Sequence, residues 1–139
     1  LPFCGYNMGD YFQHWLDMGD RLGENAPKIF YVNWFRKDAD GHFLWPGFGD
    51  NSRALKWMCE RIDGKAGARE TAIGYVPSEE DLDLTGLDMP AEDLAKILEV
   101  DCEGWNAELP SIDSFYAQFG DRLPKRLHAQ LEALRERLR

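Results

Sequence analysis

The chain has 139 residues and a mass of 16.0 kDa, about the size of one domain, and its 44 % apolar content is enough for one buried core. Sixteen Lys and Arg against 25 Asp and Glu give a net charge of −9. This acidic balance, with no basic stripe, argues against nucleic acid and anionic membranes as partners. Because no apolar run approaches the ~20 residues of a membrane span and no secretory signal is visible, we expect a soluble cytoplasmic protein.

Charged and aromatic residues are unevenly distributed along the chain. Residues 1–76 carry nine basic and ten acidic side chains, whereas residues 77–139 carry seven and 15. Thirteen of the 18 aromatic residues lie in residues 1–57, so we expect function in the first half. The sequence also begins with Leu1 rather than Met, which predicts a piece cut from a longer protein.

The cysteines and histidines do not form a recognisable ligand pattern. The three cysteines are odd in number and far apart, which fits neither a disulfide framework nor a zinc site, so we expect reduced thiols. The three histidines have no second His or Cys at ligand spacing, and no metal site is expected from this chain alone. These residues are Cys4, Cys59, Cys102, His14, His42 and His128.

The first elements are predicted from periodicity and turn residues. Apolar residues from Tyr11 to Leu22 recur at helical spacing, which predicts an amphipathic helix with Asp10 as its cap and Gly23 just beyond its end. Residues 28–35 (Lys-Ile-Phe-Tyr-Val-Asn-Trp-Phe) are aromatic and β-branched, which predicts a strand covered on both faces. The polar run 36–42 ends in Asp-Gly, so it and the following apolar residues are expected to form a hairpin or a tight loop.

A loop and a second helix are expected next. Two glycines and a proline in residues 46–50 (Pro-Gly-Phe-Gly-Asp) exclude regular structure and favour a close backbone approach. Asn51 or Ser52 can cap a helix whose apolar positions end before Gly64. Cys59 lies on the apolar face of that helix and is predicted to be a buried, inert thiol.

The second half of the sequence is predicted to be mainly helical. Residues 71–76 are a short strand candidate, and residues 77–81 predict a brief acidic helix in which Ser78 precedes an acidic residue by three positions. Three further helices are indicated by apolar spacing at 94–98, 112–119 and 127–138. Prolines at 90 and 110 are placed in first helical turns, where proline is favoured. The fold class is therefore mixed α/β.

One segment has the composition of a ligand site. Five aromatic residues between Trp34 and Phe48 are separated by polar loop and glycine, so they cannot all face one core layer, and exposed rings suit a flat ligand. The planar amide of Asn51 could read a purine edge, with glycine backbone close by and Arg53 near a helix amino end. The commoner alternative is that the rings are core and Asn51 is a helix cap. The residues alone leave both interpretations open.

The same residues carry a family resemblance. Residues 2–7 (Pro-Phe-Cys-Gly-Tyr-Asn), 33–37 (Asn-Trp-Phe-Arg-Lys) and 43–53 (Phe-Leu-Trp-Pro-Gly-Phe-Gly-Asp-Asn-Ser-Arg) closely resemble the carboxy-terminal part of GTP-dependent phosphoenolpyruvate carboxykinase. The resemblance continues through 73–77 (Ile-Gly-Tyr-Val-Pro) and weakens over the helical tail. The run at 43–53 is long and unusual, and it makes the resemblance specific.

The resemblance implies a fold, a reaction and a set of binding residues. It implies part of a carboxykinase carboxy-terminal lobe: a few strands packed by helices, in which residues 1–76 form the guanine-binding part and residues 77–139 an acidic, mainly helical cap of the same domain. The parent reaction is the lyase conversion of oxaloacetate and GTP to phosphoenolpyruvate, GDP and CO2 in gluconeogenesis, with Mn or Mg. In this family, guanine is held between phenylalanines, and the matching nucleotide-binding residues here are Phe35, Phe43, Phe48, Gly49, Asp50 and Asn51.

The resemblance also implies what this chain does not supply. No Gly-x-x-x-x-Gly-Lys-Ser/Thr loop occurs here, and the family's metal ligands, substrate arginines and mobile lid are expected upstream of Leu1. The chain alone is therefore expected to be inactive, to ligate no metal, and to dock on the rest of the enzyme. The alternative from another class is a non-catalytic module whose aromatic loops bind a peptide or a sugar.

Overall fold

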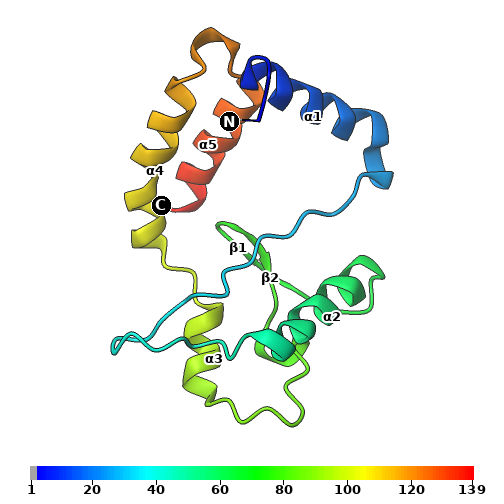
Figure 1. Ribbon diagram of the computed structural model, residues 1–139, viewed down its shortest axis with the longest axis vertical. Coiled ribbons are helices and arrows are strands. Elements are labelled where there is room, and N and C mark those ends of the chain that lie inside the picture. Colours follow the sequence, from blue (N-terminus) through cyan, green and yellow to red (C-terminus); the bar gives the residue numbers. More distant parts are fainter. Residues whose placement is uncertain (1–2) are drawn as a thin grey trace. The chain divides into compact units, whose positions relative to one another are not determined.

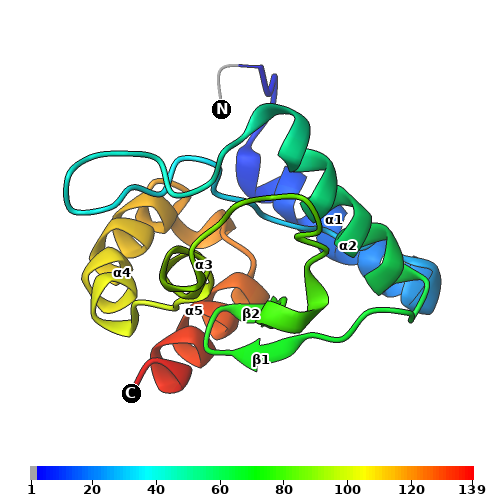
Figure 2. The ribbon, with the colours of Figure 1, turned by 90° about the horizontal axis from the view of Figure 1, so that it is seen from below.

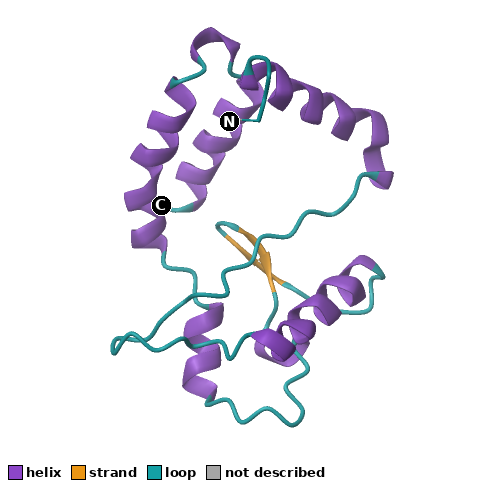
Figure 3. Cartoon of the chain, viewed as in Figure 1, coloured by secondary structure: helices purple, strands orange, loops and turns teal. Residues whose placement is uncertain are grey.

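The computed structural model describes residues 3–139, so the first two residues of the predicted guanine-binding part and the Pro2 of the 2–7 motif lie outside the described residues. The chain forms two compact units. One consists of residues up to 27 together with 101–139, and the other of residues 28–100. Helices predominate, with one small antiparallel sheet, as Figures 1 and 3 show. This agrees with a mixed α/β class at the coarse level.

The first unit is helical. It contains α1 (Met8–Leu22), the 3-10 turn η1 (Gly23–Asn25), α4 (Cys102–Ala117), the 3-10 turn η4 (Gly120–Arg122) and α5 (Lys125–Arg137). Its buried apolar residues are Leu109, Phe119, Leu123, Leu131 and Leu138. Phe119 is central because its ring meets those of Phe12 and Phe115 edge to face, at centroid distances of 5.5 and 5.3 Å.

The first helix begins earlier than predicted. Asn7, not Asp10, is its cap, because the Asn7 side-chain oxygen accepts the Gly9 N–H at 2.8 Å. Asp10 instead lies in the first turn and pairs with Arg122 at 2.6 Å. The predicted end is confirmed, since Gly23 follows the last helical residue with a φ of 53°.

The placement of Pro110 at a helix start was wrong. It lies inside α4, which begins at Cys102, before the predicted apolar pattern at 112–119. The helix is capped by Asp101, whose carboxylate accepts the Gly104 N–H at 2.9 Å. A proline at this depth leaves one helical carbonyl without its usual donor, and the helix nevertheless continues to Ala117. The predicted helix α5 is confirmed beside it, where Asn106 donates to the Leu138 carbonyl at 3.2 Å (Figure 1).

The second unit combines short helices with a hairpin. It contains η2 (Phe48–Asp50), α2 (Asn51–Ile62), β1 (Arg69–Thr71), β2 (Gly74–Val76), η3 (Glu79–Asp81) and α3 (Ala91–Leu98), seen from a second side in Figure 2. Its buried apolar residues are Leu44, Trp45, Trp57 and Leu94. The Trp57 indole donates to the Gly67 carbonyl at 3.1 Å, which ties α2 to the segment leading into β1.

The predicted strand at 28–35 was wrong for this chain. These residues form no strand, and Ile29 and Tyr31 are each 93 % exposed. A strand is stabilised by hydrogen bonds to a neighbouring strand, and the part of the chain that the structure describes places none beside this segment. The strand candidate at 71–76 is instead the last residue of one strand, a turn and the second strand of a hairpin, in which Arg69 pairs with Val76 and Thr71 with Gly74.

Local helix signals in the second unit were more reliable. The Asp81 carboxylate accepts both the N–H and the O–H of Ser78, at 2.8 and 2.6 Å, which confirms the expected turn chemistry at the start of the acidic η3. These bonds from Ser78 hold the pKa of Asp81 below its usual range. Helix α3 is confirmed, with Leu94 facing the core. The prediction that Cys59 is buried was wrong, because its side chain is exposed on α2.

Within residues 3–139, no helix combines the length and the apolar character needed to cross a membrane. The predicted division into 1–76 and 77–139 is a division by role, and it stays a prediction.

Candidate functional site

A tight hairpin brings the first two candidate rings together. Lys37 and Phe43 form an isolated antiparallel bridge, and the Leu44 N–H donates to the Arg36 carbonyl at 3.0 Å. The rings of Phe35 and Phe43 therefore meet edge to face with centroids 6.1 Å apart. They remain 71 % and 57 % exposed, so this pair is a surface and not part of the core.

The loop after the hairpin presents the third ring. Gly47 and Phe48 have φ values of 73° and 47°. Phe48 is the one non-glycine residue with positive φ among the described residues, and its side chain is 99 % exposed. A left-handed backbone conformation is unfavourable for a residue with a side chain, and the exposed ring of Phe48 gains no burial that would offset this cost. Such strain at an exposed aromatic residue is typical of a binding site.

Asn51 is not a helix cap, although the sequence offered that alternative. It is the first residue of α2, and its side-chain oxygen accepts the indole N–H of Trp45 at 2.9 Å. The other expected cap, Ser52, was also wrong, since its hydroxyl donates to the Gly49 carbonyl at 2.7 Å. Asn51 therefore stays half-buried beside the loop, with its amide nitrogen making no hydrogen bond within residues 3–139.

Asp50 and Gly49 complete the loop. One Asp50 carboxylate oxygen accepts from Arg53 at 2.9 Å, and Arg53 also donates to the Asp83 carbonyl at 2.6 Å. Through these two bonds, Arg53 connects the loop to the segment after η3. A Cβ built on Gly49 would meet nothing within 4 Å, so open space lies next to this backbone.

A second tie links α2 to the same segment. Lys56 pairs with Asp83 at 2.7 Å, and this hydrogen bond holds the pKa of Asp83 well below its usual range while raising that of Lys56. Both ties hold the start of α2, and therefore Asn51, in a fixed place within the unit.

The structure brings the predicted residues only partly together. Phe35 pairs with Phe43, and residues 48–51 are consecutive, but no ring contact joins Phe48 to the pair among residues 3–139. The role of Trp45 was missed. Sequence reasoning placed it among rings that could stack, whereas it is buried and bonded to Asn51.

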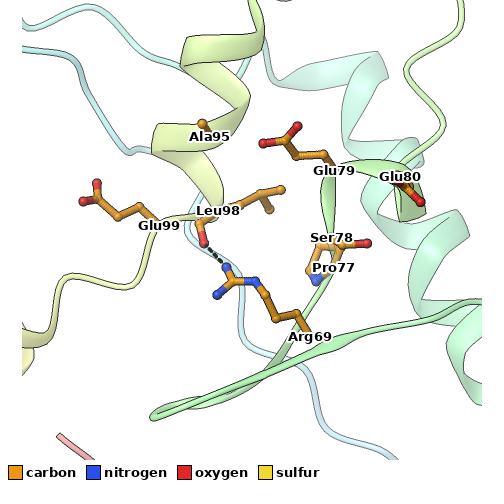
Figure 4. A pocket seen from close by; sticks show the side chains of 8 residues that line it. All are labelled: Arg69, Pro77, Ser78, Glu79, Glu80, Ala95, Leu98 and Glu99. Atoms are coloured by element: carbon orange, nitrogen blue, oxygen red, sulfur yellow. Dashed lines mark hydrogen bonds between the residues drawn. The ribbon is translucent and has the colours of Figure 1, made fainter.

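A cavity of about 560 Å³ lies elsewhere in the same unit. Figure 4 shows its wall of mixed charge, with the Arg69 guanidinium bonded to the Leu98 carbonyl at 2.8 Å and the Glu79 carboxylate on the opposite side. No sequence signal pointed to it. The aromatic site is an open surface, and its exposed rings and strained loop point to a ligand.

One cluster has the residue types of a metal site. Asp38, Asp40 and His42 each offer a ligand atom within 4.8 Å of the others. Turn formation accounts for this arrangement, because one Asp38 oxygen accepts the N–H groups of Asp40 and His42 at 2.9 and 2.8 Å. The bond from the His42 backbone leads the causes that lower the pKa of Asp38.

Comparison with known proteins decides the family. A family model described as "Phosphoenolpyruvate carboxykinase C-terminal P-loop domain" matches residues 1–137. The chain belongs to this family. A relative from Neocallimastix frontalis, "Phosphoenolpyruvate carboxykinase [GTP]", is 57 % identical and covers 100 % of this chain. Relatives of the same name from Arthrobacter sp. (strain FB24) and Renibacterium salmoninarum are 55 % and 56 % identical over 99 % of it.

The chain covers only 23 % of the length of each of these carboxykinases. Although the family description names a P-loop, this carboxykinase chain contains no Gly-x-x-x-x-Gly-Lys-Ser/Thr motif. The resemblance inferred from the run at 43–53 is confirmed, and the alternative of a peptide- or sugar-binding module is not favoured.

Proposed function

We propose that this chain is the guanine-recognising, carboxy-terminal portion of a GTP-dependent phosphoenolpyruvate carboxykinase. The full polypeptide would convert oxaloacetate and GTP to phosphoenolpyruvate, GDP and CO2. The proposal is supported by the name of the relatives and by one structural observation, the exposed phenylalanine rings carried by a strained loop next to Asn51. Residues 1–76 contain that surface, and residues 77–139 serve as its acidic helical cap.

Each predicted residue has a role in this proposal. Phe35, Phe43 and Phe48 stack on the base, and stacking on an aromatic ring contributes about 1–3 kcal/mol per base. Gly49 lets the nucleotide approach the backbone because it has no Cβ. Asp50 contacts the nucleotide with the oxygen that Arg53 does not occupy. Asn51 reads the edge of the guanine ring.

The phosphates, the substrate and the metal are assigned to the rest of the enzyme. Asp38, Asp40 and His42 do not fit the catalytic metal, since one Asp38 oxygen already serves two backbone donors and His42 and Asp40 are exposed in the turn. These residues are therefore not assigned to the catalytic metal. This chain alone is expected to be inactive, and its contribution is to hold the base.

The remaining part of the enzyme is the proposed docking partner. Ile29 and Tyr31 are almost fully exposed in a segment rich in strand-forming residues, and such a segment is stabilised by pairing with another strand. A cytoplasmic location is proposed on the basis of the three free thiols.

The experiment is a carboxykinase assay on the full-length polypeptide with GTP, ITP and ATP compared. Wild type is expected to prefer GTP strongly over ATP. Asn51→Ala should lose about 1–3 kcal/mol of that discrimination, because the buried polar edge it reads is then left unpaired. Arg126→Ala is the control, since Arg126 pairs with Asp20 in the other unit and has no role in the site.

Two results would contradict the proposal. Equal use of ATP and GTP by the wild-type enzyme would remove the guanine-specific function. An Asn51→Ala enzyme that preferred GTP as strongly as wild type would show that another residue reads the base.

A further inference from the structure

The amide of Asn51 is held in one orientation. The Trp45 indole N–H lies 2.9 Å from Oδ1 of Asn51. An indole nitrogen donates and cannot accept, so the amide atom that faces it must be the carbonyl oxygen. The orientation of this amide therefore follows from the chemistry of its partner.

Both partners are anchored. The Trp45 side chain is only 6 % exposed and lies beside Trp34, with ring centroids 6.5 Å apart. At the other end, the Asn51 backbone N–H donates to the carbonyls of Phe48 and Gly49 at the start of α2. Neither side chain can turn freely, because rotation of the amide would leave a buried indole N–H unpaired.

With its oxygen engaged by Trp45, the NH2 group of Asn51 is the part of the amide that makes no hydrogen bond among residues 3–139. Guanine carries an acceptor, the 6-oxo group, where adenine carries an amine that donates. A fixed donor pairs with the first and opposes the second. Resting on the proposed function, we propose that Trp45 is a positioning residue that makes Asn51 a hydrogen-bond donor to the 6-oxo group of guanine.

The test uses the full-length enzyme and four triphosphates: those of guanosine, inosine, 2-aminopurine riboside and adenosine. Inosine keeps the 6-oxo group and lacks the 2-amino group, whereas 2-aminopurine keeps the 2-amino group and lacks the 6-oxo group. The two analogues therefore separate contacts with the edge made by the 6-oxo group and N1, where the Asn51 contact is assigned, from contacts with the 2-amino group. The measured quantities are kcat and KM for each nucleotide.

Trp45→Phe removes the N–H and retains an aromatic ring. Wild type should use GTP about 10- to 100-fold better than 2-aminopurine triphosphate in kcat/KM, as expected for a site that pairs with a polar group of its ligand. In Trp45→Phe this ratio should fall to about a third of its value or less, because the amide can then rotate. The ratio of GTP to ITP should stay at the wild-type value, and the change should appear in KM.

Trp34→Phe is the matched control. This variant removes the other indole of the same pair of rings, and the Trp34 indole nitrogen makes no hydrogen bond among residues 3–139. Its nucleotide ratios should equal those of wild type. A role limited to packing would lower activity with every nucleotide alike, whereas a positioning role changes only the ratio that depends on the 6-oxo group.

A second variant keeps the proposal testable if Trp45→Phe fails to fold. Asn51→Asp leaves an oxygen for the Trp45 indole and replaces the donating NH2 with an acceptor. It should lose the preference for the 6-oxo group and gain relative activity with ATP.

The outcomes are distinguishable. If folded Trp45→Phe kept the wild-type ratio of kcat/KM for GTP to that for 2-aminopurine triphosphate, the role assigned to Trp45 would be overturned. The same ratio kept in Asn51→Asp would overturn the role of the donor group. Indifference of the wild-type enzyme to all four bases would instead mean that the proposed function itself is wrong.

Discussion

At the scale of single residues, the site depends on side chains that the protein core does not use. Phe48 is 99 % exposed on left-handed backbone, whereas Trp45, three positions earlier, is buried and bonded to Asn51. The candidate rings could be predicted because aromatic residues in a glycine-rich loop cannot all face one core. The bond between Trp45 and Asn51 could not, because it depends on the path of the loop between them, which positive φ values at Gly47 and Phe48 determine.

Phe48→Ala tests whether the exposed ring serves binding. Alanine bears the same cost for left-handed backbone as phenylalanine, so thermal stability should stay unchanged. The KM for GTP in the full-length enzyme should rise about 5- to 100-fold, corresponding to the loss of one stacking ring. Tyr75→Ala, an exposed aromatic residue in the hairpin of the same unit, is the control and should keep the wild-type KM. A wild-type KM in Phe48→Ala would remove Phe48 from the site.

Asp83→Asn tests the tie between α2 and the segment after η3. The pKa of Asp83 is lowered in the folded chain, so its carboxylate stabilises the fold above its ordinary pKa of about 4 and loses that effect as pH falls through the lowered value. Asp83→Asn should therefore melt at a lower temperature than wild type at pH 7, and the difference should shrink below about pH 4. Melting curves by circular dichroism measure it, with Glu80→Gln as control. A difference that does not change with pH would show that the ion pair is not its source.

At the scale of elements, prediction succeeded where the signal was local. Helices α3 and α5 followed from apolar spacing, and the end of α1 followed from Gly23. The strand at 28–35 failed because a strand requires a partner that local composition does not supply. The two-residue turn at 72–73 was missed because it lacks the Asn-Gly or Asp-Gly pattern of common hairpin turns.

Gly9→Ala tests how α1 packs within its unit. A Cβ at this position would collide with the Arg122 backbone carbonyl, and a backbone atom cannot move aside as a flexible side chain can. We expect a loss of about 1–3 kcal/mol in the free energy of unfolding, typical of overpacking. Gly19→Ala, in the same helix with open space around it, should instead stabilise by about 0.5–1 kcal/mol. Chemical denaturation measures both, and equal effects at the two positions would refute this packing.

At the scale of the whole molecule, this chain supplies one part of a longer enzyme in our proposal. Residues 28–33 have no regular secondary structure, and Ile29 and Tyr31 are almost fully exposed, which suits a segment that pairs with another strand. Hydrogen exchange should find the amides of 29–33 unprotected in the 139-residue chain and protected in the full-length polypeptide, because pairing shields backbone N–H groups. Amides within α5 should be protected in both. Fast exchange at 29–33 in the full-length protein would contradict the proposed pairing.

The most direct measurement of the central claim is a crystal structure of the full-length polypeptide with bound GTP. The predicted result is guanine stacked against the rings of Phe35, Phe43 and Phe48, with the Asn51 amide nitrogen within hydrogen-bond distance of the 6-oxo group. Guanine bound away from these rings, for example in the cavity beside Arg69, would contradict it.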